Sequence, residues 1–332
     1  MWSSWNVRSP PAPSAQSRWA RLPPVLRHRQ FPMRCSTRWA SILIRCPSRR
    51  KRCSGLFRKR RADMQIREYQ KPATLDEAYA LLVKGKTNRI LGGCTFLKRT
   101  NVKIGTAIDL SACGLDYIRE TEEAVMIGAY TSLRDIETSA VILENFGPAL
   151  REVLEHLIGV QLRNVITIGA HVASRFGFSD IIPTLLAMNA SLRFYRGGVK
   201  SLWAYMNEDV PERDILLEIV LPKEGRRTKV QMMRLSYNDY SIFCLAASRV
   251  KENWIIAAGV FPGRAKLAEK TMSEMRDTPV TRGRAAELAR RITAEYRFGT
   301  NYRGTAEYRR TLCEVFARRA IEELADEDSC KM

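Results

Sequence analysis

The sequence contains no long hydrophobic run. Its most apolar short stretch, residues 181–188, is only eight residues long and follows the polar pair Ser179-Asp180. A helix that crosses a bilayer needs about 18 to 20 apolar residues in succession. The sequence therefore predicts a soluble protein without a membrane span.

Metal-binding cysteine spacings are also missing. The chain has 8 cysteines, and no two of them form a Cys-x-x-Cys pair. Zinc sites and iron–sulfur clusters are typically held by closely spaced thiolates, so we expect neither in this chain. Scattered cysteines without a secretory signal indicate free thiols in a reducing cytoplasm.

Basic charge is abundant but confined to one part of the chain. The formal net charge is +20, and residues 1–63 hold 16 Lys or Arg against a single acid. The remaining residues carry 39 bases and 34 acids, a net charge of only +5. A nucleic-acid-binding protein that grips phosphates with its N-terminal arm stays an alternative of another class. It is disfavoured because no basic stripe with interleaved aromatics remains after residue 63.

Residues 1–63 show neither helical nor strand periodicity. They include four of the 6 tryptophans and seven of the 14 prolines. Such a segment cannot bury a core. Three interpretations remain open: a disordered basic arm, an organelle-targeting peptide, or residues translated upstream of the true start. We favour the third, because ordinary fold patterning begins at Met64.

The pattern after Met64 is that of a small α/β unit. Strands are predicted over residues 64–69, 89–91, 106–110 and 124–129. Thr74 and Glu77 form a capping box at the start of a helix. A long helical stretch, residues 139–157, is interrupted at Gly147-Pro148.

From residue 164 the predicted order is strand, glycine-bearing turn, helix and strand, ending near Pro222. Polar residues 223–228 mark a domain boundary. Strands are then predicted over residues 230–235, 242–250 and 254–260, and helices over residues 285–296 and 307–324. Strands followed by helices are typical of a separate α+β domain, so the predicted domains are residues 64–222 and residues 229–325.

Two small-residue turns carry the chemical information, one in residues 89–97 and one in residues 163–174. Glycines let the backbone approach an anion closely, so that consecutive N–H groups converge on phosphate oxygens. Gly-Gly after a strand is more often a plain turn. Two such turns in one domain nevertheless favour a phosphate-bearing ligand, and neither has the Gly-x-Gly-x-x-Gly spacing of a Rossmann fold.

These turns resemble the two flavin loops of the FAD-binding subunits of xanthine dehydrogenase and carbon monoxide dehydrogenase. Leu-Gly-Gly-Cys-Thr-Phe-Leu at 91–97 is similar to the first loop, and Arg-Asn-x-x-Thr-Ile-Gly-Ala-His at 163–171, followed by Ser-Asp-x-x-Pro, to the second. The family usually has Gly-Gly-Asn where this chain has Gly-Ala-His. Ile-Asp-Leu-Ser, Ile-Gly-Ala-Tyr-Thr-Ser and a closing Tyr-Arg element at 308–309 stand at the expected positions. The resemblance spans about residues 64–324.

The resemblance implies an α+β fold: a two-subdomain FAD-binding domain of the vanillyl-alcohol-oxidase (PCMH) type, then a smaller α+β C-terminal domain. It also implies noncovalent FAD. The residues carried over to the cofactor site are Arg89, Ile90, Leu91, Gly92, Gly93, Cys94, Thr95 and Phe96, then Thr167, Ile168, Gly169, Ala170 and His171, and finally Asp180, Leu216 and Arg234. The first group would wrap the diphosphate, and the second would hold the cofactor from the other side.

Several of these residues have a plain structural alternative. Asp180 could cap the helix that begins at Ile181, Leu216 could be an ordinary core residue, and Arg234, where the family commonly has a lysine, could be a solvated surface charge. His171 could bind the cofactor by a hydrogen bond, pack in the core or attach the cofactor covalently. The absence of a partner base nearby in the sequence disfavours the covalent bond.

Partner subunits follow from the same resemblance. In the family, electrons arrive singly from iron–sulfur clusters and leave in pairs to NAD or another acceptor. Because this chain has no cluster cysteines and no recognisable pterin site, molybdopterin and the [2Fe–2S] clusters are expected only on a large subunit and an iron–sulfur subunit. A stand-alone FAD-dependent oxidoreductase is the alternative, and the closing Tyr-Arg element argues against it.

Overall fold

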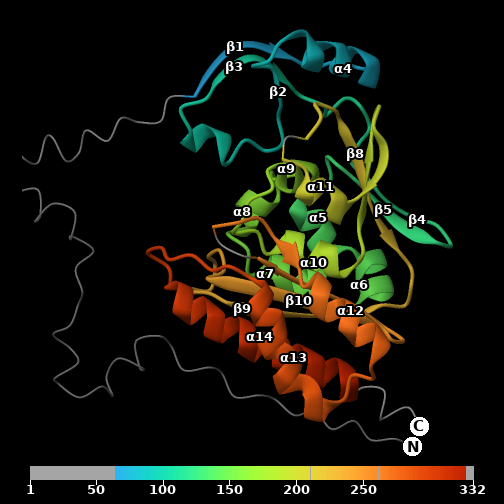
Figure 1. Ribbon diagram of the computed structural model, residues 1–332. Helices are drawn as coiled ribbons and strands as arrows, with labels where there is room; N and C mark the ends of the chain where they lie inside the picture. Colours follow the sequence, from blue (N-terminus) through green and yellow to red (C-terminus); the bar gives the residue numbers. More distant parts are fainter. Residues whose placement is uncertain (1–63, 210, 260–261, 327–332) are drawn as a thin grey trace, which may run out of the picture. The chain divides into compact units, whose positions relative to one another are not determined.

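The computed structural model describes residues 64–209, 211–259 and 262–326. The interpretations of residues 1–63 lie outside the described residues. The described chain forms three sheets with helices between and around them, so the predicted α+β class is confirmed (Figure 1). Within the described ranges, no helix combines the length and the apolar content that a bilayer crossing requires.

The first sheet is small and parallel, with one covering helix. Its elements are β1 (Gln65–Gln70), α4 (Leu75–Lys84), β2 (Arg89–Ile90) and β3 (Lys103–Ile108), in the strand order β1-β3-β2. Thr74 caps α4 by accepting the amide of Glu77, and the Glu77 carboxylate accepts the amide of Ala73. The first bond satisfies an amide that the helix start leaves free, and the second satisfies the amide of the residue just before the cap, so the predicted cap at Thr74 is confirmed. Leu82 of α4 shares a core cluster with Ile108 of β3.

The second sheet is antiparallel, in the order β4-β5-β8-β6-β7. Its strands are β4 (Ile118–Glu120), β5 (Ala124–Gly128), β6 (Ser191–Phe194), β7 (Gly198–Ser201) and β8 (Leu216–Pro222). The helices of this part are α5 (Leu133–Thr138), α6 (Ala140–Phe146), α7 (Ala149–Glu155), α8 (Val160–Arg163), α9 (Ile168–Ala173), α10 (Ile181–Ala187) and α11 (Leu202–Asn207). Gly147, at φ +70°, ends α6 and Pro148 precedes α7, so the predicted interruption is confirmed.

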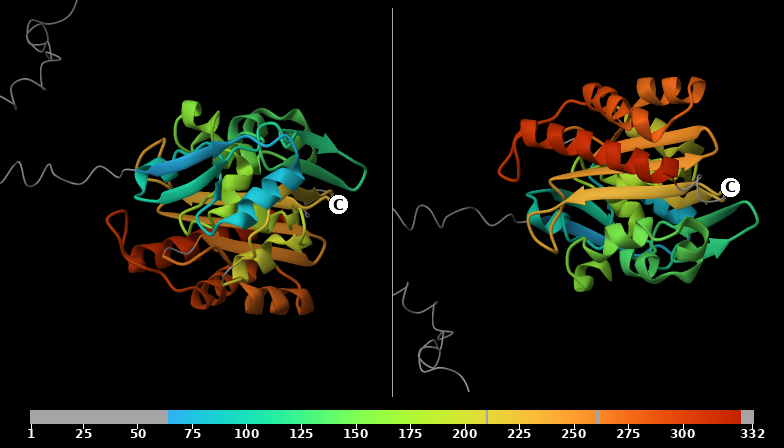
Figure 2. Two further views of the ribbon diagram at one scale, coloured as in Figure 1. Left: turned by 90° about the horizontal axis from the view of Figure 1, so that it is seen from above. Right: turned by 90° about the horizontal axis from the view of Figure 1, so that it is seen from below.

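The third sheet begins the C-terminal part and is antiparallel, in the order β12-β11-β10-β9. Its elements are β9 (Arg227–Met233), β10 (Phe243–Val250), β11 (Asn253–Gly259) and β12 (Lys266–Leu267), followed by α12 (Glu269–Asp277), the 3₁₀ turn η3 (Arg282–Arg284), α13 (Ala285–Glu295) and α14 (Ala306–Asp326). One face of this sheet contacts α7 and α10, and the other contacts α12 and α14 (Figures 1 and 2). Because both faces are covered, β10 is almost wholly buried.

The strand predicted before the second turn is wrong. Residues 164–166 belong to no strand, and Thr167 makes only an isolated bridge to Ser132. Thr167 instead caps α9, with its hydroxyl accepting the amide of Ala170 at 3.4 Å. Alternation of apolar and polar residues over so few positions cannot separate a strand from the first turn of a helix. Gly169, Ala170 and His171 therefore lie in a helix, not in a turn.

Two further differences come from weak patterns. The helix α12 was not expected, because only Thr271, Met272 and Met275 of it are buried and its apolar stripe is narrow. The strand β9 begins at Arg227, inside the polar stretch that separates the predicted domains. At the start of β9, Arg227 and Lys229 are partly buried, whereas Thr228 between them is buried.

Candidate functional site

The two small-residue segments touch each other. We call residues 89–96 the first glycine loop and residues 167–171 the second glycine segment. A Cβ atom added to Gly92 would lie 2.2 Å from the Ala170 Cβ and 2.7 Å from the Thr167 hydroxyl oxygen. Only glycine permits so close an approach, so the packing of the two segments depends on Gly92.

The first glycine loop offers unpaired amides. Gly93 and Cys94 both have positive φ, at +75° and +53°, which turns the chain sharply after β2. Gly93 also passes over Val165, whose carbonyl oxygen would be 2.1 Å from an added Cβ. The N–H groups of Gly93, Cys94, Thr95 and Phe96 have no acceptor anywhere in the described part of the chain. Consecutive free amides in a turn of this kind suit an anion.

The amides of Ile168 to His171 in the second glycine segment already have acceptors within the protein. Ile168 and Gly169 donate to the carbonyls of Thr131 and Ala129, at 3.0 and 2.9 Å. The amides of Ala170 and His171 return to Thr167 within the first turn of α9. This segment therefore supplies a close-packed wall, and the first glycine loop supplies the free donors.

Asp180 and Arg234 form a buried ion pair. They come from the start of α10 and from just after β9, and their side chains lie 3.0 Å apart with 1% and 9% exposed. Burial raises the pKa of Asp180 to about 6, although the charge of Arg234 opposes this shift. Apart from the ion pair, Asp180 Oδ2 receives no hydrogen bond among the described residues. This buried oxygen therefore has acceptor capacity left over.

The plain alternatives for these two residues are wrong. Asp180 stands at the N-cap position of α10, but its side chain makes no capping hydrogen bond; the amide of Ile182 donates instead to the Ser179 hydroxyl at 3.1 Å, so Ser179 provides the capping side chain. Arg234 is not a surface charge, because its guanidinium donates to the backbone carbonyls of His156 and Asp239 at 2.8 and 2.6 Å. These bonds hold Arg234 in one orientation against Asp180.

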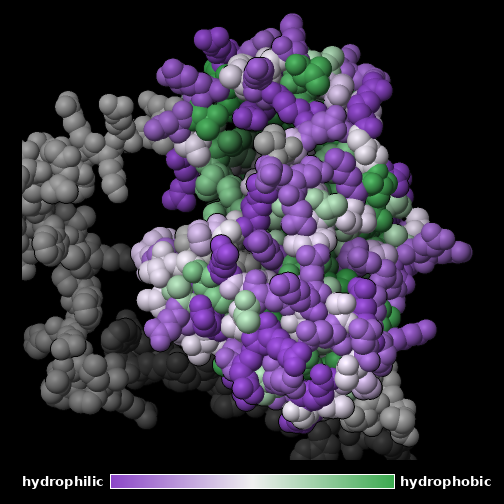
Figure 3. Space-filling model, viewed as in Figure 1, coloured by the Kyte–Doolittle hydropathy of each residue, from purple (hydrophilic) through white to green (hydrophobic). Residues whose placement is uncertain are grey.

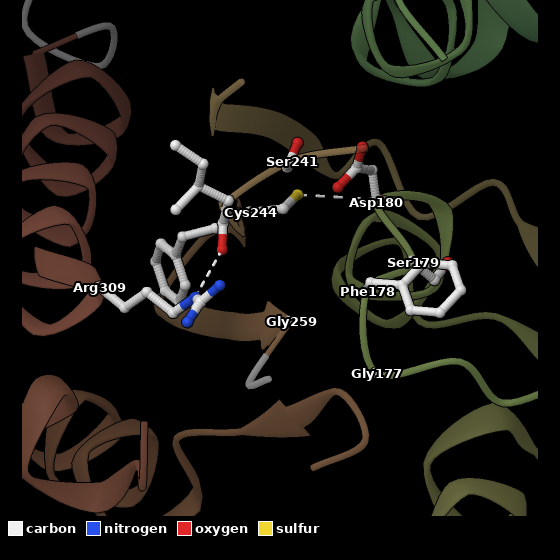
Figure 4. Close-up of a pocket in the computed structure, with 10 residues that line it drawn as sticks. Gly177, Phe178, Ser179, Asp180, Ser241, Cys244, Gly259 and Arg309 are labelled. Atoms are coloured by element: carbon white, nitrogen blue, oxygen red, sulfur yellow. Dashed lines mark hydrogen bonds between the residues drawn. The ribbon is translucent and has the colours of Figure 1, made fainter. Parts of the chain in front are cut away.

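A small pocket adjoins the ion pair. It lies between residues 177–180 and β10 and has room for about one water molecule. In Figure 4, Asp180 and Cys244 approach each other on one side, and Arg309 of α14 reaches the Ile242 carbonyl on the other, at 2.9 Å. The pocket itself is too small for a flavin ring.

The two parts of the chain match two family models. Residues 62–224 match the FAD-binding domain found in molybdopterin dehydrogenases, and residues 229–324 match the C-terminal domain of the CO dehydrogenase flavoprotein. The chain belongs to the family of FAD-binding medium subunits of molybdenum hydroxylases. It is thus the flavoprotein subunit of a molybdenum-dependent oxidoreductase.

Known relatives of this flavoprotein subunit differ in how much of their length it covers. The glyceraldehyde dehydrogenase medium chain of Sulfolobus acidocaldarius is 24% identical over 280 residues, which are 77% of this chain and 98% of the relative. Aldehyde oxidase 4 of Mus musculus is 30% identical over 148 residues, and the match covers 40% of this chain but only 11% of the oxidase. The structure of carbon monoxide dehydrogenase from Hydrogenophaga pseudoflava aligns with a TM-score of 0.70 at 23% identity over 78% of this chain and 97% of that one. This structural similarity shows that the two chains share a fold.

The residues of the flavoprotein subunit fit FAD. The free amides of Gly93 to Phe96 can receive a diphosphate, and Asp180 Oδ2 can accept a hydrogen bond from a hydroxyl or a ring N–H. Both lie on segments that the resemblance assigns to the cofactor. Figure 3 shows apolar side chains gathered in a hollow between the β1–β3 sheet and helices α8 and α9, on the side of the first glycine loop.

His171 is buried and neutral. Its Nε2 lies 2.7 Å from the Ser179 hydroxyl, and burial lowers its pKa to about 4. The contact ties α9 to the segment that carries Asp180. His171 thus has a structural partner inside the protein, whichever of its predicted roles holds.

Leu216 lies at the first position of β8, 9% exposed and within the main core cluster of the FAD-binding part. The structure therefore supports its interpretation as a core residue, and a contact with the cofactor remains a prediction.

Sequence reasoning missed an aromatic cluster beside the site. Phe96 of the first glycine loop lies 4.4 Å from Phe176, Phe176 stacks on Phe178 at 4.8 Å, and Phe178 meets Tyr240 edge to face at 4.9 Å between ring centroids. The Phe-x-Phe pair at 176 and 178 was a visible signal. The partners of this pair, Phe96 and Tyr240, come from two distant segments, so only the folded structure connects them.

Proposed function

We propose that this chain holds one noncovalent FAD and passes electrons from iron–sulfur clusters on a partner subunit to NAD or another acceptor. The proposed cofactor residues are those of the first glycine loop and the second glycine segment, together with Asp180, Leu216 and Arg234. Molybdopterin and the [2Fe–2S] clusters would be on a large subunit and an iron–sulfur subunit. The proposed location is the cytoplasm.

The observation that carries this proposal is the row of unpaired amides from Gly93 to Phe96, held against the second glycine segment. Backbone N–H groups fixed in this way are donors that need no reorganisation when an anion arrives. Because these amides carry no charge, they can hold the diphosphate of FAD, and other groups recognise the flavin end of the cofactor. The rest of the recognition falls to side chains on α10 and after β9.

Asp180 and Arg234 would serve the flavin end. Arg234 is anchored by two backbone carbonyls, so its charge stays beside the site whether or not a ligand is present. Asp180 keeps one oxygen available as an acceptor. When bound, FAD supplies the redox chemistry, and the protein's task is to bind, orient and electrostatically tune it.

An absorption spectrum of the purified chain tests the cofactor. The proposal expects the two flavin bands, with the colour released by heat or acid because no covalent bond forms. A preparation that is colourless, and stays so after incubation with excess FAD, would contradict it.

Mild purification tests the partners. The chain is expected to elute with an iron–sulfur protein and a large molybdopterin protein at low salt, because its sequence shows no cluster-binding cysteine spacing and no recognisable pterin site. Recovery of the lone, flavin-loaded chain under the same conditions would favour the stand-alone oxidoreductase. Steady-state reduction of NAD, compared with that of artificial dyes, would then identify the acceptor.

A further inference from the structure

Tyr130 connects three segments beneath the first glycine loop. It follows β5, and its ring is half-buried. Its hydroxyl accepts the amide of Leu110 at 3.0 Å and makes a short hydrogen bond to the carbonyl of Leu91. Leu91 is the residue immediately before Gly92, so the contact lies at the point where the chain leaves β2 for the loop.

Asp109 holds this hydroxyl from the other side. Asp109 Oδ1 lies 3.2 Å from the Tyr130 hydroxyl and also accepts the amide of Ser111 at 2.9 Å. Asp109 Oδ2 accepts the hydroxyl of Tyr69 at 2.6 Å. The carboxylate is thus supplied with donors from β1 and from its own turn.

The Tyr130 hydroxyl has one proton, which it shares between two acceptors, the Leu91 carbonyl and Asp109 Oδ1. The contact to the Leu91 carbonyl is the shorter, so the proton is directed mainly there. Because Asp109 already has Tyr69 and Ser111 as donors, it competes only weakly for the Tyr130 proton. The amide of Leu91 is also bound, to the carbonyl of Ile108 at 2.8 Å. Both polar groups of the Leu91 backbone are therefore fixed.

We propose that Tyr130 is a positioning residue for the cofactor, because its hydroxyl fixes the Leu91 carbonyl and so presents the amides of Gly93 to Phe96. This inference rests on the proposed function and adds a residue that contributes no atom to the site itself. Only Gly92 separates the fixed carbonyl from the first free amide, so a change in the Leu91 peptide plane is transmitted directly into the loop.

The protonation states support the geometry. Burial raises the pKa of Tyr130, so the hydroxyl remains a donor at any physiological pH. Burial alone would raise the pKa of Asp109, but the hydrogen bonds from Tyr69, Ser111 and Tyr130 outweigh it and lower that pKa. Asp109 therefore stays an ionised acceptor, and the arrangement does not switch with pH in the working range.

The test compares Tyr130→Phe with Tyr117→Phe in the full chain. Tyr117 is the matched control, because its hydroxyl donates to Glu218 of the second sheet at 2.5 Å and to neither glycine segment. Two quantities are measured: the FAD dissociation constant by fluorescence titration, and the Tm of the FAD-free protein. Loss of one hydrogen bond that positions the loop should weaken FAD binding about tenfold in Tyr130→Phe. Tyr117→Phe should lower the Tm about as much as Tyr130→Phe does, yet it should bind FAD as tightly as the unaltered chain.

An affinity of Tyr130→Phe within twofold of the unaltered chain would overturn the inference, and so would an equal loss in both variants, since that would reveal a general structural effect. If the unaltered chain binds no FAD, the proposed function fails instead.

A second variant covers the case in which Tyr130→Phe does not fold. Tyr69→Phe alters an exposed side chain and takes a donor from Asp109, which then draws the Tyr130 proton away from Leu91. Its FAD affinity should fall by about two- to threefold. An unchanged affinity in a folded Tyr69→Phe protein would count against the inference.

Discussion

At the scale of single residues, Gly93 shows how one position can combine two constraints. Its positive φ strains any residue with a Cβ, and its closeness to the Val165 carbonyl leaves no space for one. Gly225 has nearly the same backbone angle, φ +67°, but nothing within 4 Å of an added Cβ. A comparison of substitutions at the two glycines therefore separates the effect of backbone strain from that of a steric clash.

Gly93→Ala should weaken FAD binding by at least about tenfold. The left-handed backbone costs about 1–2 kcal/mol in either variant, and only Gly93→Ala adds the clash with Val165 and displaces the loop amides. Gly225→Ala should lose some stability but keep its affinity. Fluorescence titration of both variants measures this, and equal dissociation constants would show that the loop geometry is not what binds FAD.

Asp180 gives the protein a predictable pH dependence. Its folded pKa of about 6 lies above the unfolded value of 3.8, so the folded state binds more protons between these values. The contribution of Asp180 to the free energy of unfolding should therefore be greatest below pH 4, fall as the pH rises to 6 and stay constant above 7. The fall should be roughly 3 kcal/mol, at 1.36 kcal/mol per pKa unit.

Urea unfolding of the unaltered chain and of Asp180→Asn at several pH values isolates this contribution. From pH 4 to pH 6, the free energy of unfolding of the unaltered chain should fall relative to that of Asp180→Asn. His171 titrates in an overlapping range with the opposite sign, but it is present in both proteins and cancels. A difference that does not vary with pH would place the folded pKa of Asp180 near its ordinary value.

At the scale of elements, α9 decides the shape of the second glycine segment. It is a short helix of 6 residues, so its start has a large share in its stability. Thr167 provides the cap, and its side chain also faces Gly92 of the first glycine loop. The same hydroxyl therefore starts the helix and borders the contact between the two segments.

Thr167→Ala should lower the free energy of unfolding by about 1 kcal/mol, the usual cost of a lost N-cap. Thr167→Ser keeps the hydroxyl and should lie within about 0.5 kcal/mol of the unaltered chain. Urea denaturation measures both. If the two variants were equally destabilised, the lost methyl group, and not the cap, would be responsible.

At the scale of the whole described chain, α10 belongs to two layers at once. All of its residues are buried, and it contacts both β10 and β11 of the C-terminal sheet. Ser248 of β10 donates a hydrogen bond to the Ala187 carbonyl at the end of α10. The C-terminal sheet thus has one of its two faces covered by the preceding domain.

This shared layer predicts that residues 229–326 do not fold alone. Without α7 and α10, one face of the sheet would expose its apolar residues, and the core would lose that part of its burial. The fragment should show no cooperative thermal transition by circular dichroism, whereas the chain from Met64 to its end should unfold in a single step. A cooperative transition in the isolated fragment would mean that α12–α14 suffice.

The sequence alone determined those features that depend on local chemistry. The cap at Thr74, the break at Gly147-Pro148 and the glycines of the first loop could be read directly, because each reflects a backbone requirement that neighbouring residues satisfy. The family patterns around them indicate the α+β class and predict the cofactor.

Only the tertiary structure decided how distant segments meet. It placed Arg234 against Asp180, made Ser179 the capping side chain of α10, coiled residues 168–173 into a helix and joined Phe96 to Tyr240 through two other rings. None of these follows from sequence spacing, because burial and pairing depend on which surfaces the folded chain brings together. The local sequence determines which interactions each residue can make, and the packing of the folded chain decides which residue is its partner.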